Sequence, residues 1–372
     1  MSSVRPTGVR GAYAGPVSHL AAVRGVLPDH SYAQADVTAA FADVLGSTGS
    51  DRALLERFHA NAGVSQRHLA LPLERYWQLA DFGAANDEFI RVGTELGSHA
   101  VTKALAASGL TPRDVDLIMS TTITGLAVPS IEARVAAEIG LRDDVKRVPL
   151  VGLGCVAGAA GVARVHDYLL GHPDDIAVLL SVELCSLTVQ RDDRSTANLV
   201  ASGLFGDGAA AVVMVGAHRA AALAPAQPRV VATRSRLYPG TERAMGWDVG
   251  ATGLRIVLGA EVPDLVRENV RDDVDRFLAG QGLTRADIGW WVAHPGGPKV
   301  LEAMEEALEV DREALGVTWR SLDRIGNLSS ASVLHVLADT LADHTPEPGS
   351  WGVLMAMGPG FCLELVLLRA AD

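Results

Sequence analysis

The stretch GLTPRDVDLIMSTT at residues 109–122 has a second, similar copy in the chain, GLTRADIGWWVAH at residues 282–294. Aligned without gaps, Asp114 falls on Asp287 and Thr121 on His294, which is an offset of 173 residues (287 − 114). In both copies a glycine turn precedes a short run rich in apolar residues, which is typical of a buried strand. The repeat therefore predicts two similar α/β halves.

The same offset relates two segments further along the chain. It carries Cys155, in VGLGCVAGAAG (151–161), to residue 328, next to Asn327 in IGNLSSASVLHVLADTL (325–341). Each segment has a glycine turn, then small residues, then a helical pattern. We therefore expect Cys155 to open a helix in the first half and Asn327 to be its counterpart in the second half.

Helical and strand patterns alternate along the rest of the chain. Residues 88–108 have helical spacing, and residues 177–184 and 209–216 read as buried strands. This alternation favours a layered α/β architecture. We place the division between the two halves after residue 220, so that residues 1–220 carry Cys155 and residues 221–372 carry His294 and Asn327.

Composition narrows the function classes. The 372 residues are 48% hydrophobic and 20% charged, which is typical of a folded globular protein, and the net charge of −12 opposes general nucleic-acid binding. No apolar run is long enough to span a membrane, and the first residues lack the hydrophobic segment of a signal peptide. The three cysteines form neither a disulfide framework nor a metal-binding spacing. We expect a cytoplasmic protein with reduced thiols and no metal.

The position of Cys155 suggests nucleophilic chemistry. The start of a helix favours an anion, so a thiolate there has a pKa below the usual value of about 8.5. An imidazolium would lower it further, and His294 is the candidate because it ends a strand and precedes a PGGP loop. The alternative for each residue is structural: Cys155 as a small buried hydrophobe, like Cys185 and Cys362, and His294 and Asn327 as core or capping residues.

Five blocks distributed over the chain resemble type III polyketide synthases, the chalcone-synthase-like branch of the thiolase superfamily. The resemblance runs from about residue 20 to the C-terminus. It implies the thiolase fold, two related halves in a five-layer αβαβα stack, and a homodimer. The blocks are GCVAGAAG, LFGDGAAAVV, AHPGGPKVLE, IGNLSSASVL and WGVLMAMGPGFCLELVLLRA.

The resemblance implies a role for each matching residue. Cys155 is the nucleophile that carries the acyl chain as a thioester, and His294 forms an ion pair with it. Asn327, together with His294, binds the malonyl thioester and stabilises the enolate formed on decarboxylation, as two donors aimed at one oxygen can do. Phe205 is the gatekeeper between a coenzyme A tunnel and the cavity.

The substrates implied by the resemblance are acyl-CoA and malonyl-CoA esters, used without a carrier protein or any other cofactor. Arg57 and Lys299 lie near positions of the tunnel rim, although solvated surface charges are the alternative for both. Val128 is expected near the cavity of the partner in the dimer. The positions that match the family's cavity are Ile123, Thr124, Val128, Thr188, Trp247, Ile256, Gly358 and Pro359.

These cavity positions also suggest a product. Bacterial tetrahydroxynaphthalene synthases resemble one another in having a second cysteine where this chain has Ile123, which argues against that product here. The apolar pair Ile123 and Ile256 favours a fatty acyl starter, and Trp247 favours closure of a carbon–carbon ring. We therefore expect an alkylresorcinol built with malonyl-CoA, or conceivably methylmalonyl-CoA. The alternatives are an alkylpyrone, a phloroglucinol-type or tetrahydroxynaphthalene product, or an enzyme like β-ketoacyl carrier-protein synthase III.

Overall fold

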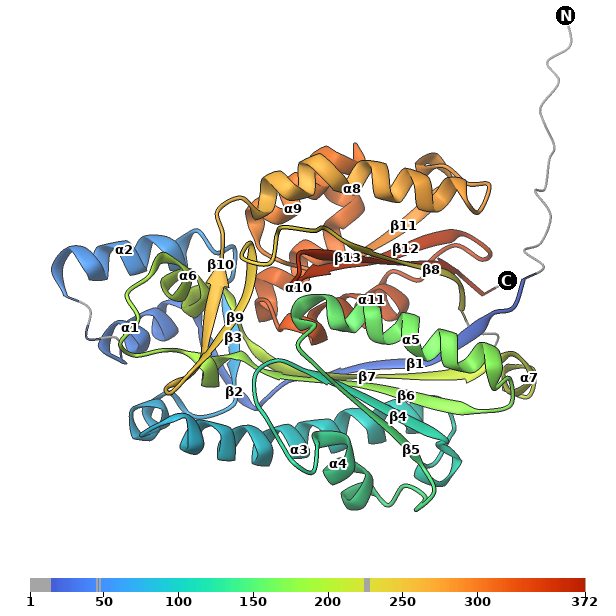
Figure 1. The fold of residues 1–372 in the computed structure, drawn as a ribbon, viewed down its shortest axis with the longest axis horizontal. Helices are drawn as coiled ribbons and strands as arrows, with labels where there is room; N and C mark the ends of the chain where they lie inside the picture. The colour runs from blue at the N-terminus through green and yellow to red at the C-terminus, as the bar shows by residue number, and fades with distance from the viewer. Residues whose placement is uncertain (1–14, 45, 47, 224–227, 372) are drawn as a thin grey trace, which may run out of the picture.

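The computed structural model describes residues 15–371 except 45, 47 and 224–227. Within these residues, nine strands form one hydrogen-bonded sheet in the order β11-β12-β13-β8-β1-β7-β6-β4-β5. The sheet bends where β1 meets β8, because those strands pair only at Ser18 with Val230 and at His19 with Arg229. Figure 1 shows the two layers that result, one above the other.

Each layer is built from one half of the chain. In the first, β4 runs parallel to β5 and β6, and β7 runs antiparallel to β6 and β1. In the second, β11 and β12 are parallel, and β13 is antiparallel to β12 and β8. The first layer comprises β1 (Ser18–Val26), β4 (Leu117–Thr122), β5 (Lys146–Val151), β6 (Ile176–Leu184) and β7 (Asp207–Gly216). The second comprises β8 (Arg229–Leu237), β11 (Ile288–Ala293), β12 (Trp351–Gly358) and β13 (Cys362–Arg369).

Helices cover both outer faces and fill the space between the sheets (Figure 1). Three separate apolar cores lie between successive layers, so the predicted five-layer αβαβα stack is confirmed. One outer layer holds α3 (Phe82–Ala107) and α4 (Ile131–Ile139), and the central layer holds α5 (Ala157–Gly171) and α11 (Ser332–Asp343). The other outer layer holds α8 (Val262–Ala279) and α9 (Pro298–Leu308).

The remaining elements gather around the ends of the sheets. The two-stranded hairpin of β9 and β10 is separate from the large sheet, as is the pair of β2 and β3. These elements are β2 (His30–Ala33), α1 (Gln34–Val44), α2 (Gly49–Ala60), β3 (Gln66–Leu69), α6 (Thr196–Leu204), α7 (Ala217–Ala220), β9 (Met245–Gly250), β10 (Gly253–Leu258) and α10 (Gly316–Ile325). None of the helices in the described part of the chain could cross a membrane.

The repeat appears as the same local structure in both halves. Gly109 and Gly282 have left-handed φ values of 70° and 71°, which glycine adopts without strain. Each is followed by a capping box, Thr111 with Asp114 and Thr284 with Asp287, and then by a strand. The predicted pairing of Cys155 with Asn327 is wrong by a few residues. The two 3₁₀ turns that lead into the central helices are Gly154–Val156 and Ser329–Ala331, so Cys155 corresponds to Ser330.

A close approach within the central layer brings these two turns together. A Cβ atom on Gly158 would lie 2.3 Å from the carbonyl oxygen of Ser330, so only glycine fits there. The start of α5 therefore packs directly on the turn before α11. This contact explains why the segment around Cys155 is rich in small residues.

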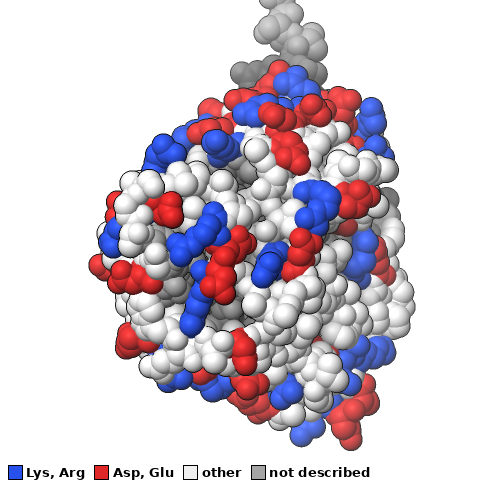
Figure 2. All heavy atoms as spheres, turned by 60° about the vertical axis from the view of Figure 1, so that its left-hand side comes forward, with Lys and Arg blue, Asp and Glu red and all other residues white. Residues whose placement is uncertain are grey.

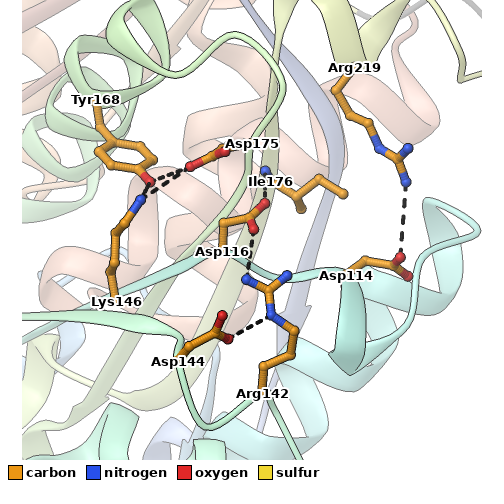
Figure 3. A network of polar contacts seen from close by, with 9 residues as sticks. All are labelled: Asp114, Asp116, Arg142, Asp144, Lys146, Tyr168, Asp175, Ile176 and Arg219. Carbon is orange, nitrogen blue, oxygen red and sulfur yellow. Dashed lines mark hydrogen bonds and ion pairs between the residues drawn. The ribbon is translucent and has the colours of Figure 1, made fainter.

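The opposite end of the first sheet is fixed by a polar network (Figure 3). Asp116 accepts hydrogen bonds from the backbone N–H of Ile176 at 2.8 Å and from Arg142 at 2.9 Å. Lys146 at the start of β5 donates to the hydroxyl of Tyr168 on α5 at 2.6 Å. These contacts hold the N-terminal ends of β4, β5 and β6 in register, while the other end of β5 leads toward Cys155.

Candidate active site

Cys155, His294 and Asn327 line one cavity, although they come from distant parts of the sequence. Cys155 lies in the turn between β5 and α5, His294 directly follows β11, and Asn327 lies between α10 and α11. All three side chains are buried. The cavity has a volume of about 40 Å³. Four further predicted residues also line it, namely Phe205, Trp247, Ile256 and Pro359.

The backbone around Asn327 fixes the direction of its amide group. Its N–H donates to Leu204 O and its C=O accepts from Gly206 N, both at 2.9 Å, so Asn327 and Phe205 form a short β-bridge. The side-chain oxygen accepts from the N–H of Ser329 at 2.8 Å. The amide oxygen is therefore used within the protein, and the NH₂ group is a donor inside the cavity, where it acts on the Cys155 sulfur and can also reach a ligand.

The imidazole of His294 has no partner inside the protein. The residue is only 3% exposed, so water does not reach the ring. Both ring nitrogens are nevertheless without a hydrogen bond. Leaving a buried polar group unpaired costs about 1–3 kcal/mol. An oxygen of a bound substrate, placed in the cavity between His294 and Asn327, would supply the missing partner.

Burial changes the charge states expected from the sequence. Burial raises the pKa of Cys155 to about 12, and the charge of Glu183 acts in the same direction. Burial also lowers the pKa of His294 to about 3. The lowered thiol pKa that the start of a helix predicts is therefore outweighed by desolvation, which favours the neutral form of both groups. A neutral imidazole can accept the thiol proton when a substrate enters.

The low pKa of His294 predicts a loss of stability in acid. Because its folded pKa lies below the ordinary 6.5, the unfolded chain binds the proton first, and stability falls as the pH drops from about 6.5 toward 3. Between pH 7.5 and pH 5.5, His294 alone lowers the free energy of unfolding by about 1.4 kcal/mol. The free energy of unfolding is therefore measured with urea at both pH values. The loss between pH 7.5 and pH 5.5 should be smaller in His294→Gln than in wild type by about this amount. The exposed His218→Gln is the control, and an equal change in both variants would contradict the assignment.

One residue of the site was not singled out from the sequence. The hydroxyl of Ser329 lies 3.7 Å from the sulfur of Cys155, and its side chain lines the same cavity. Ser329 stands in the block IGNLSSASVL, but nothing in that pattern distinguishes it from the neighbouring serines.

Four predicted cavity residues lie elsewhere. Thr124 and Thr188 line a second cavity of about 180 Å³, and their hydroxyls donate to Glu183 and to the carbonyl of Cys185. Ile123 lines a groove outside the Cys155 cavity, and Val128 is 96% exposed. Ile123, Thr124 and Val128 lie in the turns after β4, which direct neighbouring residues to different surfaces, whereas Thr188 ends the turn after β6.

Gly358 supports the site without lining it. A Cβ atom there would lie 2.7 Å from the backbone nitrogen of Val156, so this glycine allows β12 to pack against the turn of Cys155. Pro359, the next residue, does line the cavity. Its ring also lies within 2.8 Å of where a Cβ of Gly154 would be.

The two predicted rim residues lie outside the cavity lining. Arg57 is exposed on α2, with its guanidinium 6.0 Å from the ring of Phe58. Lys299 is exposed in the first turn of α9, next to Val300, which lines the cavity. Figure 2 shows the side of the molecule that lies to the left in Figure 1, where Lys and Arg are interspersed with Asp and Glu rather than gathered in one broad basic area.

The fold is that of the thiolase-type condensing enzymes, which transfer acyl groups. The tetrahydroxynaphthalene synthase structure from Streptomyces coelicolor A3(2) superposes with a TM-score of 0.88 at 28% identity, covering 95% of this chain and 99% of that one. The C-terminal type III polyketide synthase domain of Steely1 from Dictyostelium also gives 0.88, at 25% identity, covering 96% and 100%.

Family models narrow the class further. Residues 229–372 match the C-terminal domain of chalcone and stilbene synthases, and residues 54–233 match the FAE1/type III polyketide synthase-like protein model. A 1,3,6,8-tetrahydroxynaphthalene synthase of Streptomyces peucetius subsp. caesius is 58% identical over 94% of this chain and 92% of its own length. The chain belongs to the type III polyketide synthases.

Proposed function

We propose that this enzyme condenses malonyl-CoA on Cys155 into a polyhydroxylated fused aromatic, 1,3,6,8-tetrahydroxynaphthalene or a close analogue. The relative at 58% identity carries that product in its name. Oxygen on alternating carbons is the pattern left when malonyl units are joined head to tail, and it requires no fatty acyl starter. The relatives reported above do not support the alkylresorcinol and the fatty acyl starter expected from the sequence.

The observation that carries the proposal is the 58% identity to a tetrahydroxynaphthalene synthase, which extends over 94% of this chain. The synthase structure of that name from Streptomyces coelicolor A3(2) also superposes with a TM-score of 0.88. Trp247 and Ile256 are cross-strand partners in the β9–β10 hairpin and both line the Cys155 cavity. These two large side chains are therefore in a position to limit the length of the chain that Cys155 carries.

Ile123 does not line the Cys155 cavity, so the residue at this position does not exclude a tetrahydroxynaphthalene product. The backbone N–H of Ile123 donates to Glu183 at 3.1 Å, and its side chain lines the outer groove rather than the Cys155 cavity. The outer groove adjoins the Cys155 cavity, because Met245, Trp247 and Pro359 line both.

The proposed reaction uses the three polar groups of the cavity in turn. His294 takes the proton of Cys155, the sulfur attacks the thioester carbonyl, and coenzyme A leaves with that proton. A malonyl thioester then places its carbonyl oxygen between His294 and the amide of Asn327. Loss of the carboxylate as CO₂ leaves an enolate that these two donors stabilise. Its carbon attacks the Cys155 thioester, which breaks the carbon–sulfur bond, releases Cys155 as a thiolate and leaves the extended chain on coenzyme A. The thiolate then attacks the new CoA thioester and takes the chain back, and coenzyme A leaves with a proton. No metal or organic cofactor is required.

Product analysis tests the proposal. Purified enzyme is incubated with malonyl-CoA alone, and with malonyl-CoA plus palmitoyl-CoA, and the products are separated and weighed by mass spectrometry. We expect the same fused aromatic in both reactions, with no alkyl-bearing product. An alkylresorcinol or alkylpyrone that requires palmitoyl-CoA would contradict the small-starter proposal.

We also propose that the enzyme is a homodimer in which Val128 reaches the partner's cavity. Four of the seven large hydrophobic residues that are exposed in the described part of the chain lie around the free edge strand β5 and the outer groove. Exposed apolar surface of this kind is typical of an interface. These residues are Leu126, Val128, Val151 and Val249.

A charge at Val128 should therefore weaken the dimer. In Val128→Asp, each subunit would bury an unpaired carboxylate, so we expect the dimer dissociation constant to rise at least about tenfold. Sedimentation velocity over a range of concentrations measures this constant. Leu170→Asp, at a residue that is 39% exposed on α5, is the control. A monomeric wild-type enzyme, or an unchanged constant in Val128→Asp, would refute the proposed interface.

A further inference from the structure

Ser329 has a backbone conformation that serine rarely adopts. Its φ is +48°, and Glu309 is the only other non-glycine residue with positive φ in the described part of the chain. In the other half of the molecule, the corresponding first residue of the 3₁₀ turn is Gly154, with a φ of +58°. Glycine is the residue that suits this conformation, and strained residues of other types cluster at functional sites. The presence of serine at this position therefore suggests a use for its hydroxyl.

The neighbouring serines have other partners. Ser330 donates to Glu183 at 2.5 Å and contacts Ser181, and the hydroxyl of Ser332 accepts from the N–H of Leu328 at 2.6 Å. The hydroxyl of Ser329, by contrast, accepts from the thiol of Cys155 at 3.7 Å, and the residue is only 2% exposed. Its N–H meanwhile holds the amide of Asn327. Ser329 thus contacts two of the three proposed catalytic residues.

We propose that Ser329 is a fourth catalytic residue, whose hydroxyl donates a hydrogen bond to the sulfur of Cys155 whenever that sulfur is a thiolate. This inference rests on the proposed function. The sulfur becomes an anion when it loads the starter and again when the growing chain leaves it, and a donor to an anion is stronger than one to a neutral group. The titratable groups around the sulfur are His294, Glu183 on β6, and Cys185. Two uncharged donors also lie there, the hydroxyl of Ser329 and the amide of Asn327, and Ser329 has the larger effect on the pKa of the thiol.

Two substitutions separate the hydroxyl from the backbone strain. Ser329→Ala removes the hydroxyl and keeps the strain, whereas Ser329→Gly removes both. We therefore expect the melting temperature to be higher in the glycine variant than in the alanine variant, but the reactivity of Cys155 to fall equally in both. Alkylation of Cys155 by iodoacetamide, followed by mass spectrometry from pH 6 to 10, measures this reactivity without any substrate.

At pH 7.5 we expect alkylation to slow about tenfold in both variants, the effect of one pKa unit, with the profile displaced to higher pH. Ser98→Ala, a buried serine on α3 whose hydroxyl has no partner in the structure, should react like wild type. Wild-type reactivity in either Ser329 variant would overturn the proposal, as would reactivity that follows the melting temperature. Because the assay needs no CoA ester, its outcome does not depend on whether the proposed product is correct.

Discussion

Replacing Cys155 with alanine is expected to reduce product formation by at least about 10⁴-fold, because no thioester can form on the enzyme. Decarboxylation of malonyl-CoA should continue, since it depends on the donors of His294 and Asn327 rather than on the sulfur. Product yield and release of labelled CO₂ from malonyl-CoA, measured in the same reaction, separate the two steps.

Cys185→Ala is the matched control, because Cys185 is also buried and lies one residue after β6. We expect it to keep product formation within about fivefold of wild type, consistent with the usual cost of a small core change. If Cys155→Ala still released product, or if Cys185→Ala lost it to the same extent, the assignment of the nucleophile would be wrong.

The second large effect is expected from Asn327→Asp, a substitution that scarcely alters shape. The carboxylate would replace the free NH₂ donor by a negative charge beside the developing enolate. Removing one such donor costs about 10²–10³ in kcat, and we expect at least this loss in malonyl-CoA decarboxylation. The carboxylate oxygen can still accept the N–H of Ser329, so the fold should be retained.

Two measurements show whether a loss of decarboxylation comes from the amide itself rather than from a damaged thiol or fold. Alkylation of Cys155 shows whether the thiol remains reactive, and circular dichroism shows whether the fold is intact. Asn269→Asp on α8, where the amide donates to the Leu265 carbonyl at 2.8 Å, provides the control for an asparagine remote from the cavity. Retained decarboxylation in Asn327→Asp would contradict the proposed role of the amide.

Much of the fold could be predicted from the sequence because the repeat has a physical cause. Gly109 and Gly282 adopt the same turn, and the same capping box follows each, so the pattern remains visible in the residues. The counterpart of Cys155 was misplaced because a fixed offset ignores small differences in loop length between the halves. The matching 3₁₀ turns Gly154–Val156 and Ser329–Ala331, seen only in three dimensions, show the correct correspondence.

The cavity was harder to predict than its polar residues. Cys155, His294 and Asn327 follow strands or precede helices, and such positions are visible in the sequence. Whether Thr188 or Trp247 faces the sulfur depends on how loops from several layers pack, and no local pattern encodes it. Ser329 was missed for a similar reason, since its left-handed backbone and its contact with the sulfur appear only in three dimensions.

The central claim is that the polyketide is assembled on Cys155 from malonyl units. Brief incubation with ¹³C-labelled malonyl-CoA, acid quenching, proteolysis and mass spectrometry of the peptides test it most directly. The account predicts labelled adducts confined to the Cys155 peptide, spaced by two-carbon units and absent from Cys155→Ala. Adducts on the peptides of Cys185 or Cys362, or no adduct while product accumulates, would contradict it.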